Sequence, residues 1–367
     1  MEPAEIARRR LAAQGVAGPA EPSVAGAAHR LLATQAQDLH GAEWALALRS
    51  TGLRSDVDEA LASGTVVRTW PMRGTLLIVA RHDARWLTEL AAPRSFAASA
   101  SIWRRAGLVE GDFVTAASVA RDVLAGGRAL PRAALLRAFD EAGLETSGGR
   151  GSHLIRRIAG EAVIVLGPAH GTEQTLVLFD EWLPDAERLD RDEALARLAD
   201  RYLSGHGPAT VHDLAWWGGL TVTEAKRAVA LAGDAVERHD DGLLVSARSA
   251  GAGALGADRA GGPDVRLLPP FDELLLGYRD RSATLAAADF ARVVPHSNGL
   301  FSAVLTVDGV VVGVWRRSLV GSATSADASV EVEVEPFAPL PGAVASAVER
   351  RAAEYARHLG RRLILRL

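Results

Sequence analysis

The chain has 367 residues, 48% of them hydrophobic, which is enough to bury the cores of roughly two to four folded modules. It contains no cysteine, and this excludes disulfides, cysteine-ligated zinc, iron–sulfur clusters and thiol nucleophiles. The formal net charge of −4 argues against a protein that coats nucleic acid, although a basic face on an acidic body can still contact phosphates.

The remaining polar residues narrow the chemistry further. The ten histidines show no His-x-x-x-His spacing, so we expect neither a metal nor any other cofactor. Lys226 is the single lysine, so Schiff-base chemistry by a lysine would have to use this residue. No apolar run follows Arg8-Arg9-Arg10, and no segment is long enough to cross a bilayer. This pattern predicts a cytoplasmic protein without a membrane partner.

In chain order, the first notable feature is a helix followed by two glutamines. Residues 23–32 form an amphipathic pattern capped by Ser23, and Gln35 and Gln37 come just after it. Side chains two residues apart lie on nearly opposite sides of an α-helix but on the same side of an extended segment. Both amides can therefore reach one substrate only if the chain leaves the helix here. The alternative is that this polar run is a solvated helix end.

The elements that follow predict a winged helix. Two helices are expected at 41–49 and 56–63, and then two strands at 65–70 and 75–79, joined by a turn at 71–74. The same order of three helices and a hairpin recurs twice, which indicates an internal repeat. The second round is expected at 113–125, 131–142, 152–160, 162–166 and 175–179, and the third at 191–204, 210–217, 223–232 and 236–246.

The C-terminal part has the composition of strands. Asp308-Gly309 is a strong signal for a type I′ hairpin turn. Residues 251–256 have Gly-x-Gly-x-x-Gly spacing, but they lack the strand, helix and acidic residue of a dinucleotide site, so we interpret the match as accidental. Strands are expected at 265–268, 302–307, 310–315 and 330–335, and a closing helix at 341–359. The expected division is 1–110, 111–188 and 189–247 for three winged helices, 248–264 for a flexible linker and 265–367 for the β-rich part.

Several short motifs, in this order along nearly the whole chain, together resemble one family. They are Gln35-Ala36-Gln37, Arg73-Gly74-Thr75, Gly207-Pro208-Ala209-Thr210 with Asp213 and Trp217, the segment Leu267 to Arg281, and Asp308-Gly309 followed by Gly313-Val314-Trp315-Arg316. With these motifs the chain resembles the bacterial AlkZ-type winged-helix DNA glycosylases, in the branch that carries Gln-x-Gln rather than Gln-x-Asp. The resemblance implies an α+β, C-shaped protein of three tandem winged-helix units with a β-rich C-terminal part.

The resemblance also implies an activity. The family excises bulky N-alkylpurines and unhooks interstrand crosslinks formed by the antibiotic azinomycin B, which implies a role in self-resistance. Its two glutamines are the catalytic motif, and a hairpin probes the DNA. We therefore expect Gln35 and Gln37 to be catalytic and double-stranded DNA with alkylated or crosslinked purines to be the partner. We also expect a monomer in the bacterial cytoplasm, associated with the nucleoid when bound to DNA.

Physical chemistry supports this interpretation of the glutamines. An amide is a poor base and a poor nucleophile, but an N7- or N3-alkylated purine is already cationic and leaves with little acid catalysis. What remains is to place a water beside C1′ and to stabilise an oxocarbenium-like state, which amide dipoles can do. We assign Gln37 to positioning the water and Gln35 to holding the sugar, phosphate or water network. The expected product is a free abasic site, and the expected centre near Gln37 is shallow, without a deep nucleobase pocket.

Further residues are candidates for contacts to DNA. Arg279 and Arg281 alternate on an extended segment and can present two guanidinium groups to phosphate, the alternative being ion pairs with nearby carboxylates at 272, 273 and 280. Trp216 and Trp217 read as core aromatics rather than as stacking platforms. The complete set of expected DNA contacts is Arg73, Arg279, Arg281, His296, Asn298, Arg316 and Arg317.

Two other classes of function fit parts of the same pattern. Tandem winged helices with basic segments would also suffice for a transcription factor without catalysis, or for a scaffold that contacts proteins. Base release from an alkylated duplex would favour the glycosylase. Sequence-selective binding of undamaged DNA would favour the transcription factor. Failure to bind any DNA would favour the scaffold.

Overall fold

Three segments of the chain repeat one order of elements: a helix, a short strand position, two helices and a hairpin. The structure, a computed structural model, describes residues 1–171, 173–248, 262–295, 299–322 and 327–367. The first segment contains α2 (Val24–Leu31), β1 (Thr34–Gln35), α3 (Leu39–Ala47), α4 (Arg54–Ala62), β2 (Val66–Met72) and β3 (Thr75–Ala80). Its strand order is β1-β3-β2, so the short strand completes a sheet on the hairpin. This arrangement confirms the expected winged helix.

The second and third segments follow the same plan. The second contains α6 (Glu110–Leu124), β4 (Leu130–Pro131), α7 (Arg132–Glu141), α8 (Arg150–Gly160), β5 (Ile164–His170) and β6 (Glu173–Leu178), with strand order β4-β6-β5. The third contains α10 (Arg191–His206), α11 (Val211–Gly218), α12 (Val222–Ala232), β7 (Val236–Arg238) and β8 (Leu244–Ser246). In the third, a single bridge between Ala209 and Leu244 takes the place of the short strand. The short helix α9 (Phe179–Trp182) leads from the second segment to the third.

The C-terminal part is one five-stranded sheet covered by a helix. Its strands are β9 (Val265–Leu268), β10 (Ala303–Val307), β11 (Val310–Val320), β12 (Ser329–Pro336) and β13 (Arg362–Arg366), in the order β13-β12-β11-β10-β9. The helices are α13 (Glu273–Leu276), α14 (Phe290–Val293) and α15 (Gly342–His358). Asp308 and Gly309 have φ of 52° and 85°, as a type I′ turn requires, which confirms the turn expected there.

Several regular elements were not expected from the sequence. The longest are α1 (Pro3–Ala13), α5 (Ala84–Arg105) and β13. The 22-residue helix α5 contains Pro93 and many arginines, features that hide a helical pattern. It packs on β2, α8 and α10, so it connects all three winged helices. The final strand β13 pairs in parallel with β12.

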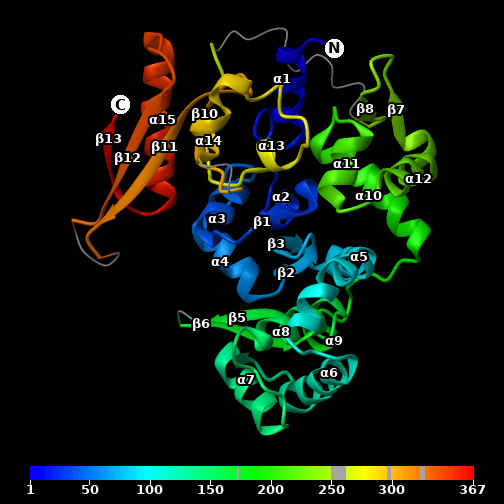
Figure 1. Ribbon diagram of the computed structural model, residues 1–367. Coiled ribbons are helices and arrows are strands. Elements are labelled where there is room, and N and C mark those ends of the chain that lie inside the picture. Colours follow the sequence, from blue (N-terminus) through cyan, green and yellow to red (C-terminus); the bar gives the residue numbers. More distant parts are fainter. Residues whose placement is uncertain (172, 249–261, 296–298, 323–326) are drawn as a thin grey trace.

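The units are arranged in a C-shaped outline (Figure 1). The first winged helix forms the middle, with α3 and α4 toward the open side at the left of the view. The β5–β6 hairpin and the β11–β12 hairpin border the opening. No helix among the described residues is both long and apolar enough to cross a membrane. The Gly-x-Gly-x-x-Gly residues at 251–256 lie outside the described part of the chain.

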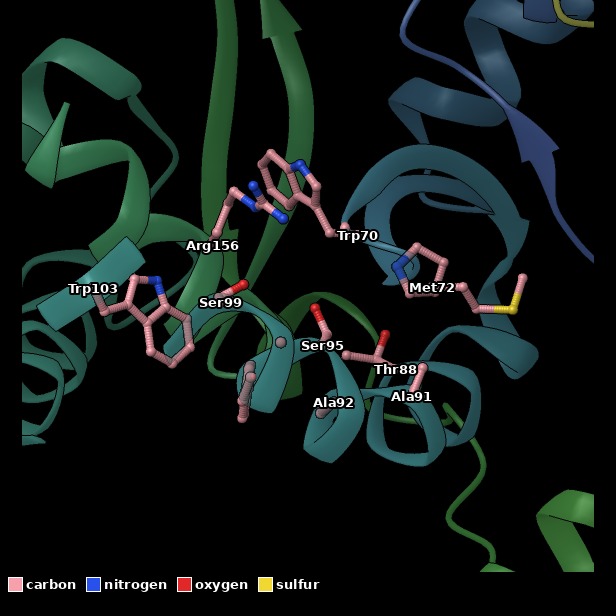
Figure 2. A pocket seen from close by; sticks show the side chains of 13 residues that line it. Trp70, Met72, Thr88, Ala91, Ala92, Ser95, Ser99, Trp103 and Arg156 are labelled. Carbon is pink, nitrogen blue, oxygen red and sulfur yellow. The ribbon is translucent and has the colours of Figure 1, made fainter. Parts of the chain in front are cut away.

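The first and second winged helices meet at a narrow seam (Figure 2). Trp70 and Met72 of β2 face α5, and Arg156 of α8 lies beside Trp70. The crevice between them has a volume of only about 20 Å³, which is the scale of one water molecule. The seam is therefore a packing joint rather than a ligand site.

Candidate active site

A tight turn releases the glutamine motif from the preceding helix. Leu32 follows α2 with φ 63° and ψ −43°, and the amide of Ala33 donates to the carbonyl of Leu31 at 2.7 Å. These values describe the strained form of the γ-turn, which costs about 1–3 kcal/mol and persists only where the surroundings enforce it. Leu32 is fully buried in the core between the first and third units, and this packing holds the turn. The chain thus leaves the helix before the motif, the condition under which both amides can face one substrate.

The two glutamines contact each other but differ in exposure. Gln35 pairs with Leu77 of β3 and is only 8% exposed, whereas Gln37 is exposed. The side-chain oxygen of Gln35 accepts hydrogen bonds from the amides of Ala36 at 2.9 Å and Gln37 at 3.3 Å. Its Nε2 donates a long hydrogen bond of 3.4 Å to Oε1 of Gln37. Gln35 is therefore placed to fix the backbone and the side chain of Gln37, and Gln37 is placed to meet a substrate.

Groups on both sides of the motif hold it in place. Arg68 of β2 donates from Nε to the carbonyl of Ala36 at 2.9 Å, and the amide of Ala36 donates to Leu76 at 2.9 Å. Burial lowers the pKa of Arg68, and the Glu43 carboxylate opposes this shift. Asp38 caps α3 by accepting from the amide of Gly41 at 3.2 Å. Arg68 was not expected from the sequence as a candidate site residue, because only the pairing of β2 with β3 brings it next to the motif.

A cleft of about 550 Å³ begins one residue after Gln37. It lies between the N-terminal part of α3 and the C-terminal sheet, and its lining includes Asp38, Trp44, Trp315 and Tyr355. Gln37 itself is not among the lining residues. A shallow centre was expected near Gln37. Gln37 is exposed and lies outside the lining of this cleft, which begins at Asp38.

Arg316 and Arg317 both line this cleft, but their surroundings differ. The exposed Arg316 guanidinium lies 3.5 Å from Glu333 and 3.7 Å from Glu335. Arg317 lies beside the Tyr355 hydroxyl and forms no ion pair with the described residues. Burial raises the pKa of Tyr355 to about 12, and the Arg317 guanidinium opposes this rise. Two glutamates therefore compensate the charge of Arg316, whereas no carboxylate among the described residues pairs with Arg317.

A second group of arginines gathers around Trp216. The guanidinium carbons of Arg73 and Arg281 lie 4.9 Å and 5.0 Å from the centre of its ring. Arg73 has φ 51° in the wing turn and packs against the C-terminal end of α11. Burial lowers the pKa of both arginines, and Arg73 lowers that of Arg281 further. Neither forms an ion pair with a described residue.

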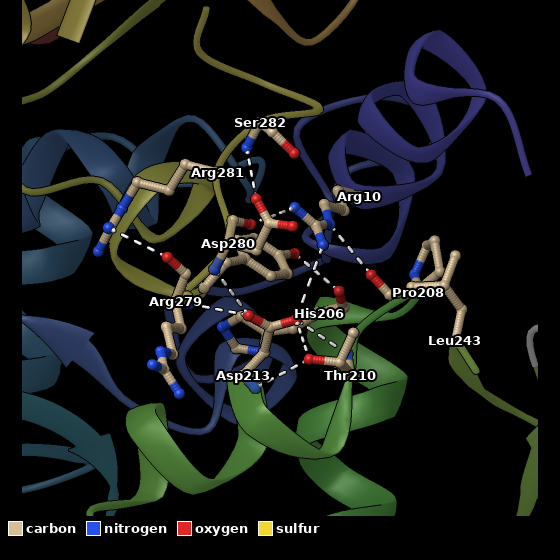
Figure 3. Close-up of polar contacts among 12 residues, drawn as sticks. Arg10, His206, Pro208, Thr210, Asp213, Leu243, Arg279, Asp280, Arg281 and Ser282 are labelled. Carbon is tan, nitrogen blue, oxygen red and sulfur yellow. Dashed lines mark hydrogen bonds and ion pairs between the residues drawn. The ribbon is translucent and has the colours of Figure 1, made fainter. Parts of the chain in front are cut away.

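Asp213 fixes the segment that carries Arg279 and Arg281 (Figure 3). Its Oδ1 accepts from the backbone amides of Arg279 at 2.9 Å and Asp280 at 3.0 Å, and its Oδ2 accepts from Thr210 at 2.8 Å. The exposed Arg279 side chain has no ion-pair partner among the described residues, and in Figure 3 both guanidinium groups extend to the same side. The segment therefore presents two cations together.

Two of the three carboxylates considered as alternative partners of these arginines are engaged elsewhere, whereas Asp280 acts electrostatically on Arg281. Asp272 forms a buried bidentate ion pair with Arg49, with distances of 2.8 Å and 2.9 Å. Glu273 accepts from Nε1 of Trp217 at 2.8 Å. Trp217 is fully buried, which confirms it as a core aromatic, whereas Trp216 is partly exposed. The remaining expected contacts, His296 and Asn298, lie outside the described residues.

Fold and site together define a tandem winged-helix protein of the kind that acts on DNA, with a carboxamide pair at its centre. The chain belongs to the family described as DNA glycosylase AlkZ-like, whose model matches residues 28–358. It is therefore a DNA glycosylase, a hydrolase of N-glycosyl bonds. This confirms the family resemblance, the fold class and the enzyme class expected from the sequence.

Two comparisons support the assignment to this family. The chain is 27% identical over 363 residues to an interstrand DNA cross-link repair glycosylase of Streptomyces sahachiroi, covering 93% of this chain and 92% of the relative. The solved structure of Streptomyces sahachiroi DNA glycosylase AlkZ superposes with a TM-score of 0.81 at 27% identity, covering 99% of this chain and 98% of that chain. Similarity therefore extends over nearly the whole length of both proteins.

Proposed function

We propose that this DNA glycosylase hydrolyses the N-glycosidic bond of bulky N-alkylpurines and unhooks interstrand crosslinks. Interstrand crosslinks are the lesion that appears in the name of its Streptomyces sahachiroi relative. The proposed crosslinks are of the type that azinomycin B forms, and unhooking them would give self-resistance to this antibiotic. The observation that carries the proposal is the exposed amide of Gln37, held by Gln35 at the edge of the first winged-helix sheet. The protein acts as a monomer on duplex DNA.

The chemistry follows from the charge of the substrate. An alkylated purine ring is cationic and leaves as a neutral base, so the enzyme needs no strong acid. Gln37 orients the water that attacks C1′, and its dipole faces the positive charge that develops on the sugar. Gln35 is largely buried and acts as a positioning residue, because its oxygen accepts from the Gln37 amide and its nitrogen reaches the Gln37 side chain.

The product is a free abasic site, because the available amines lie elsewhere. Lys226 is exposed on α12 of the third winged helix. The N-terminal ammonium of Met1 pairs with Asp241 at 2.6 Å in the turn of the third wing. Strand cleavage through a Schiff base therefore has no amine next to Gln37 within the described part of the chain.

Arginines without ion-pair partners are the proposed phosphate contacts. Arg73, Arg279, Arg281 and Arg317 keep the roles assigned from the sequence, and Arg68 joins them because it borders the motif. Burial disfavours the charge of both guanidinium groups around the indole, and Asp213 and Asp280 offset the repulsion by Arg73 at Arg281. A phosphate between the two groups would add a further compensating charge. Arg316 contributes less, since two glutamates already compensate its charge.

The test is excision from a duplex that carries 7-methylguanine. We expect release of the base and a strand break only after heating in alkali, which reveals an abasic site. A strand break without alkali would contradict the proposed product. Specific retention of undamaged DNA without any base release would instead favour a transcription factor, and absence of any DNA binding would favour a scaffold.

A further inference from the structure

The first turns of α11 and α12 share one capping motif but differ in burial. In α11, the backbone amide and the hydroxyl of Thr210 each donate to Oδ2 of Asp213 at 2.8 Å. In α12, the amide and the hydroxyl of Thr221 donate to Oε2 of Glu224 at 2.9 Å and 2.8 Å. Asp213 is fully buried, whereas Glu224 is partly exposed and pairs with Arg191. This cap uses only one carboxylate oxygen, so the burial of Asp213 calls for a second explanation.

The other oxygen of Asp213 holds a segment of the C-terminal part (Figure 3). Oδ1 accepts from the backbone amides of Arg279 at 2.9 Å and Asp280 at 3.0 Å. Two consecutive amides that converge on one anion fix the backbone between them. The Arg279 side chain starts from this fixed backbone, and Arg281 follows directly after Asp280. Asp213 therefore helps to set the direction in which both guanidinium groups leave the chain.

Arg10 of α1 closes the joint between Asp213 and this segment. It is only 3% exposed, and its Nη2 lies 4.0 Å from Oδ2 of Asp213. Its Nε donates to the carbonyl of Pro208 at 3.0 Å, and its Nη1 donates to the carbonyl of Asp280 at 3.3 Å. The guanidinium carbon lies 3.6 Å from the centre of the Tyr278 ring. A buried carboxylate that is both paired and hydrogen-bonded is held in one position, so the segment is fixed to the third winged helix.

The two arginines of the segment gain from being held. Burial lowers the pKa of Arg281, and the Asp213 carboxylate opposes this shift, so it helps to keep the guanidinium charged. A backbone that is already fixed has less freedom to lose when the guanidinium groups bind a ligand. More of the contact energy therefore appears as affinity.

The wing turn of the third unit is a poor DNA contact by comparison. It carries two exposed carboxylates, Asp240 and Asp241, and Asp241 pairs with the N-terminal ammonium of Met1 at 2.6 Å. Exposed carboxylates repel the phosphates of DNA. The third unit therefore offers phosphates less at its wing turn than at the segment that Asp213 holds.

We propose that Asp213 is a positioning residue for DNA binding, which holds Arg279 and Arg281 in the arrangement that contacts backbone phosphates. The third winged helix thereby takes part in binding through a buried carboxylate rather than through its wing turn. This inference rests on the proposed function, in which these arginines contact phosphate. Asp213 itself is too deeply buried to touch the DNA.

Fluorescence anisotropy with a duplex that carries 7-methylguanine tests this role in a matched pair of variants. We expect Asp213→Ala to weaken duplex binding by about tenfold and to lower the slope of log affinity against log salt concentration by about one. Glu224→Ala removes the same capping motif from α12 but no contact to residues 279–281, so its affinity should stay within about twofold of the unmodified chain. Circular dichroism and thermal melting check that both variants fold.

Two further readouts separate positioning from a general loss of structure. In single-turnover excision, Asp213→Ala should raise the duplex concentration for half-maximal rate by about tenfold and leave the maximal rate unchanged, because the glutamine motif is not involved. In a chain that carries Arg279→Met and Arg281→Met, adding Asp213→Ala should weaken binding by less than about twofold, because the effect needs those side chains.

A conservative pair of variants covers the case in which Asp213→Ala does not fold. Asp213→Asn keeps the shape of the side chain, but its single oxygen cannot serve both Thr210 and the segment, so we expect duplex binding to weaken by about threefold. Glu224→Gln should again leave the affinity unchanged.

The outcomes distinguish this inference from the proposed function. A loss at Asp213 no larger than that at Glu224, an equal loss with and without the two arginines, or a fall in the maximal rate alone would overturn the inference. If the chain with Arg279→Met and Arg281→Met binds DNA as the unmodified chain does, the phosphate contacts of the proposed function fail together with the inference. If that chain binds weakly while the Asp213 variants bind normally, the contacts stand and only the positioning role fails.

Discussion

The short strand position of the first winged helix differs from its counterparts in the other two. In the first unit, β1 ends at Gln35 and Asp38 caps α3, so two residues lie between the strand and the cap. In the second unit, Pro131 is both the last residue of β4 and the N-cap of α7. In the third, the bridge residue Ala209 is followed directly by Thr210, the cap of α11.

This difference teaches where the site comes from. The first two sheets share one topology, and the Ala209 bridge takes the corresponding place on the two-stranded third sheet, but only the first unit has two extra residues before the cap. One of these two residues is the exposed Gln37. The short strand of the second unit, β4, consists of Leu130 and Pro131, whose side chains offer no hydrogen-bond donor. In the proposed function, the shared fold provides the place, and the two extra residues provide the side chain to which we assign the chemistry.

The largest expected effect is at Gln37. We expect Gln37→Ala to lower single-turnover excision of 7-methylguanine by about 100- to 1,000-fold, the scale of losing one oriented polar group at a developing charge. Affinity for the duplex should stay nearly unchanged. The matched control is His212→Ala, an exposed site on α11 of the third unit, which should retain full activity. Equal losses of binding and turnover at Gln37 would contradict its assigned role.

The second effect is a loss of stability at acidic pH, and it involves His358 of α15. The His358 ring packs on Trp44 of α3, with ring centroids 5.0 Å apart. Burial lowers the pKa of His358 from 6.5 to about 4. As the pH falls, His358 therefore takes up a proton at a higher pH in the unfolded chain than in the folded chain. The free energy of unfolding falls as the pH drops from about 6.5 toward 4. The loss is of the order of 3 kcal/mol.

Urea denaturation at several pH values measures this loss. We expect the His358→Gln variant to lose much of the pH dependence between pH 7 and 4.5, while the unmodified chain becomes less stable over this range. An identical slope for both proteins would show that other groups cause it.

The third effect concerns the arginines around Trp216. We expect Arg281→Met, which keeps much of the side-chain volume, to weaken binding to any duplex by about tenfold. It should also reduce the slope of log affinity against log salt concentration by about one. Excision at saturating DNA should change little, because Arg281 is not placed at the motif. A lowered turnover rate with unchanged affinity would contradict this separation.

The smallest effect is expected at Arg316, which is exposed and paired with Glu333 and Glu335. Arg316→Ala should change the free energy of unfolding by less than about 1 kcal/mol and duplex affinity by less than Arg281→Met does. Fluorescence anisotropy with the same duplex compares the two variants directly. A larger loss at Arg316 would reverse the proposed ranking of the phosphate contacts.

The local architecture was largely predictable from the sequence. The cap at Ser23, the Asp308-Gly309 turn and the order of helices and hairpins follow from short-range patterns, and the structure confirms them. The helix α5 was not predicted, because Pro93 and its mixed surface hide the period of its apolar residues.

The surroundings of the site were less predictable because they depend on contacts between distant residues. Arg49 and Asp272 are 223 positions apart, and nothing local marks them as a buried pair. Arg73 was expected only as a DNA contact in the first wing turn, and its packing on Trp216 depends on how the first and third units meet. The sequence and its family resemblance marked the glutamines as candidates, while the cleft and the cation cluster required the structure.

The central claim is that a positively charged leaving group makes an amide sufficient for catalysis. The most direct measurement compares single-turnover base release from two duplexes, one with 7-methylguanine and one with its neutral isostere 7-methyl-7-deazaguanine. The account predicts release of 7-methylguanine and no detectable release of the isostere, although both duplexes bind equally well. Release of the neutral base at a comparable rate would contradict it, because the enzyme would then have to supply the acid catalysis itself.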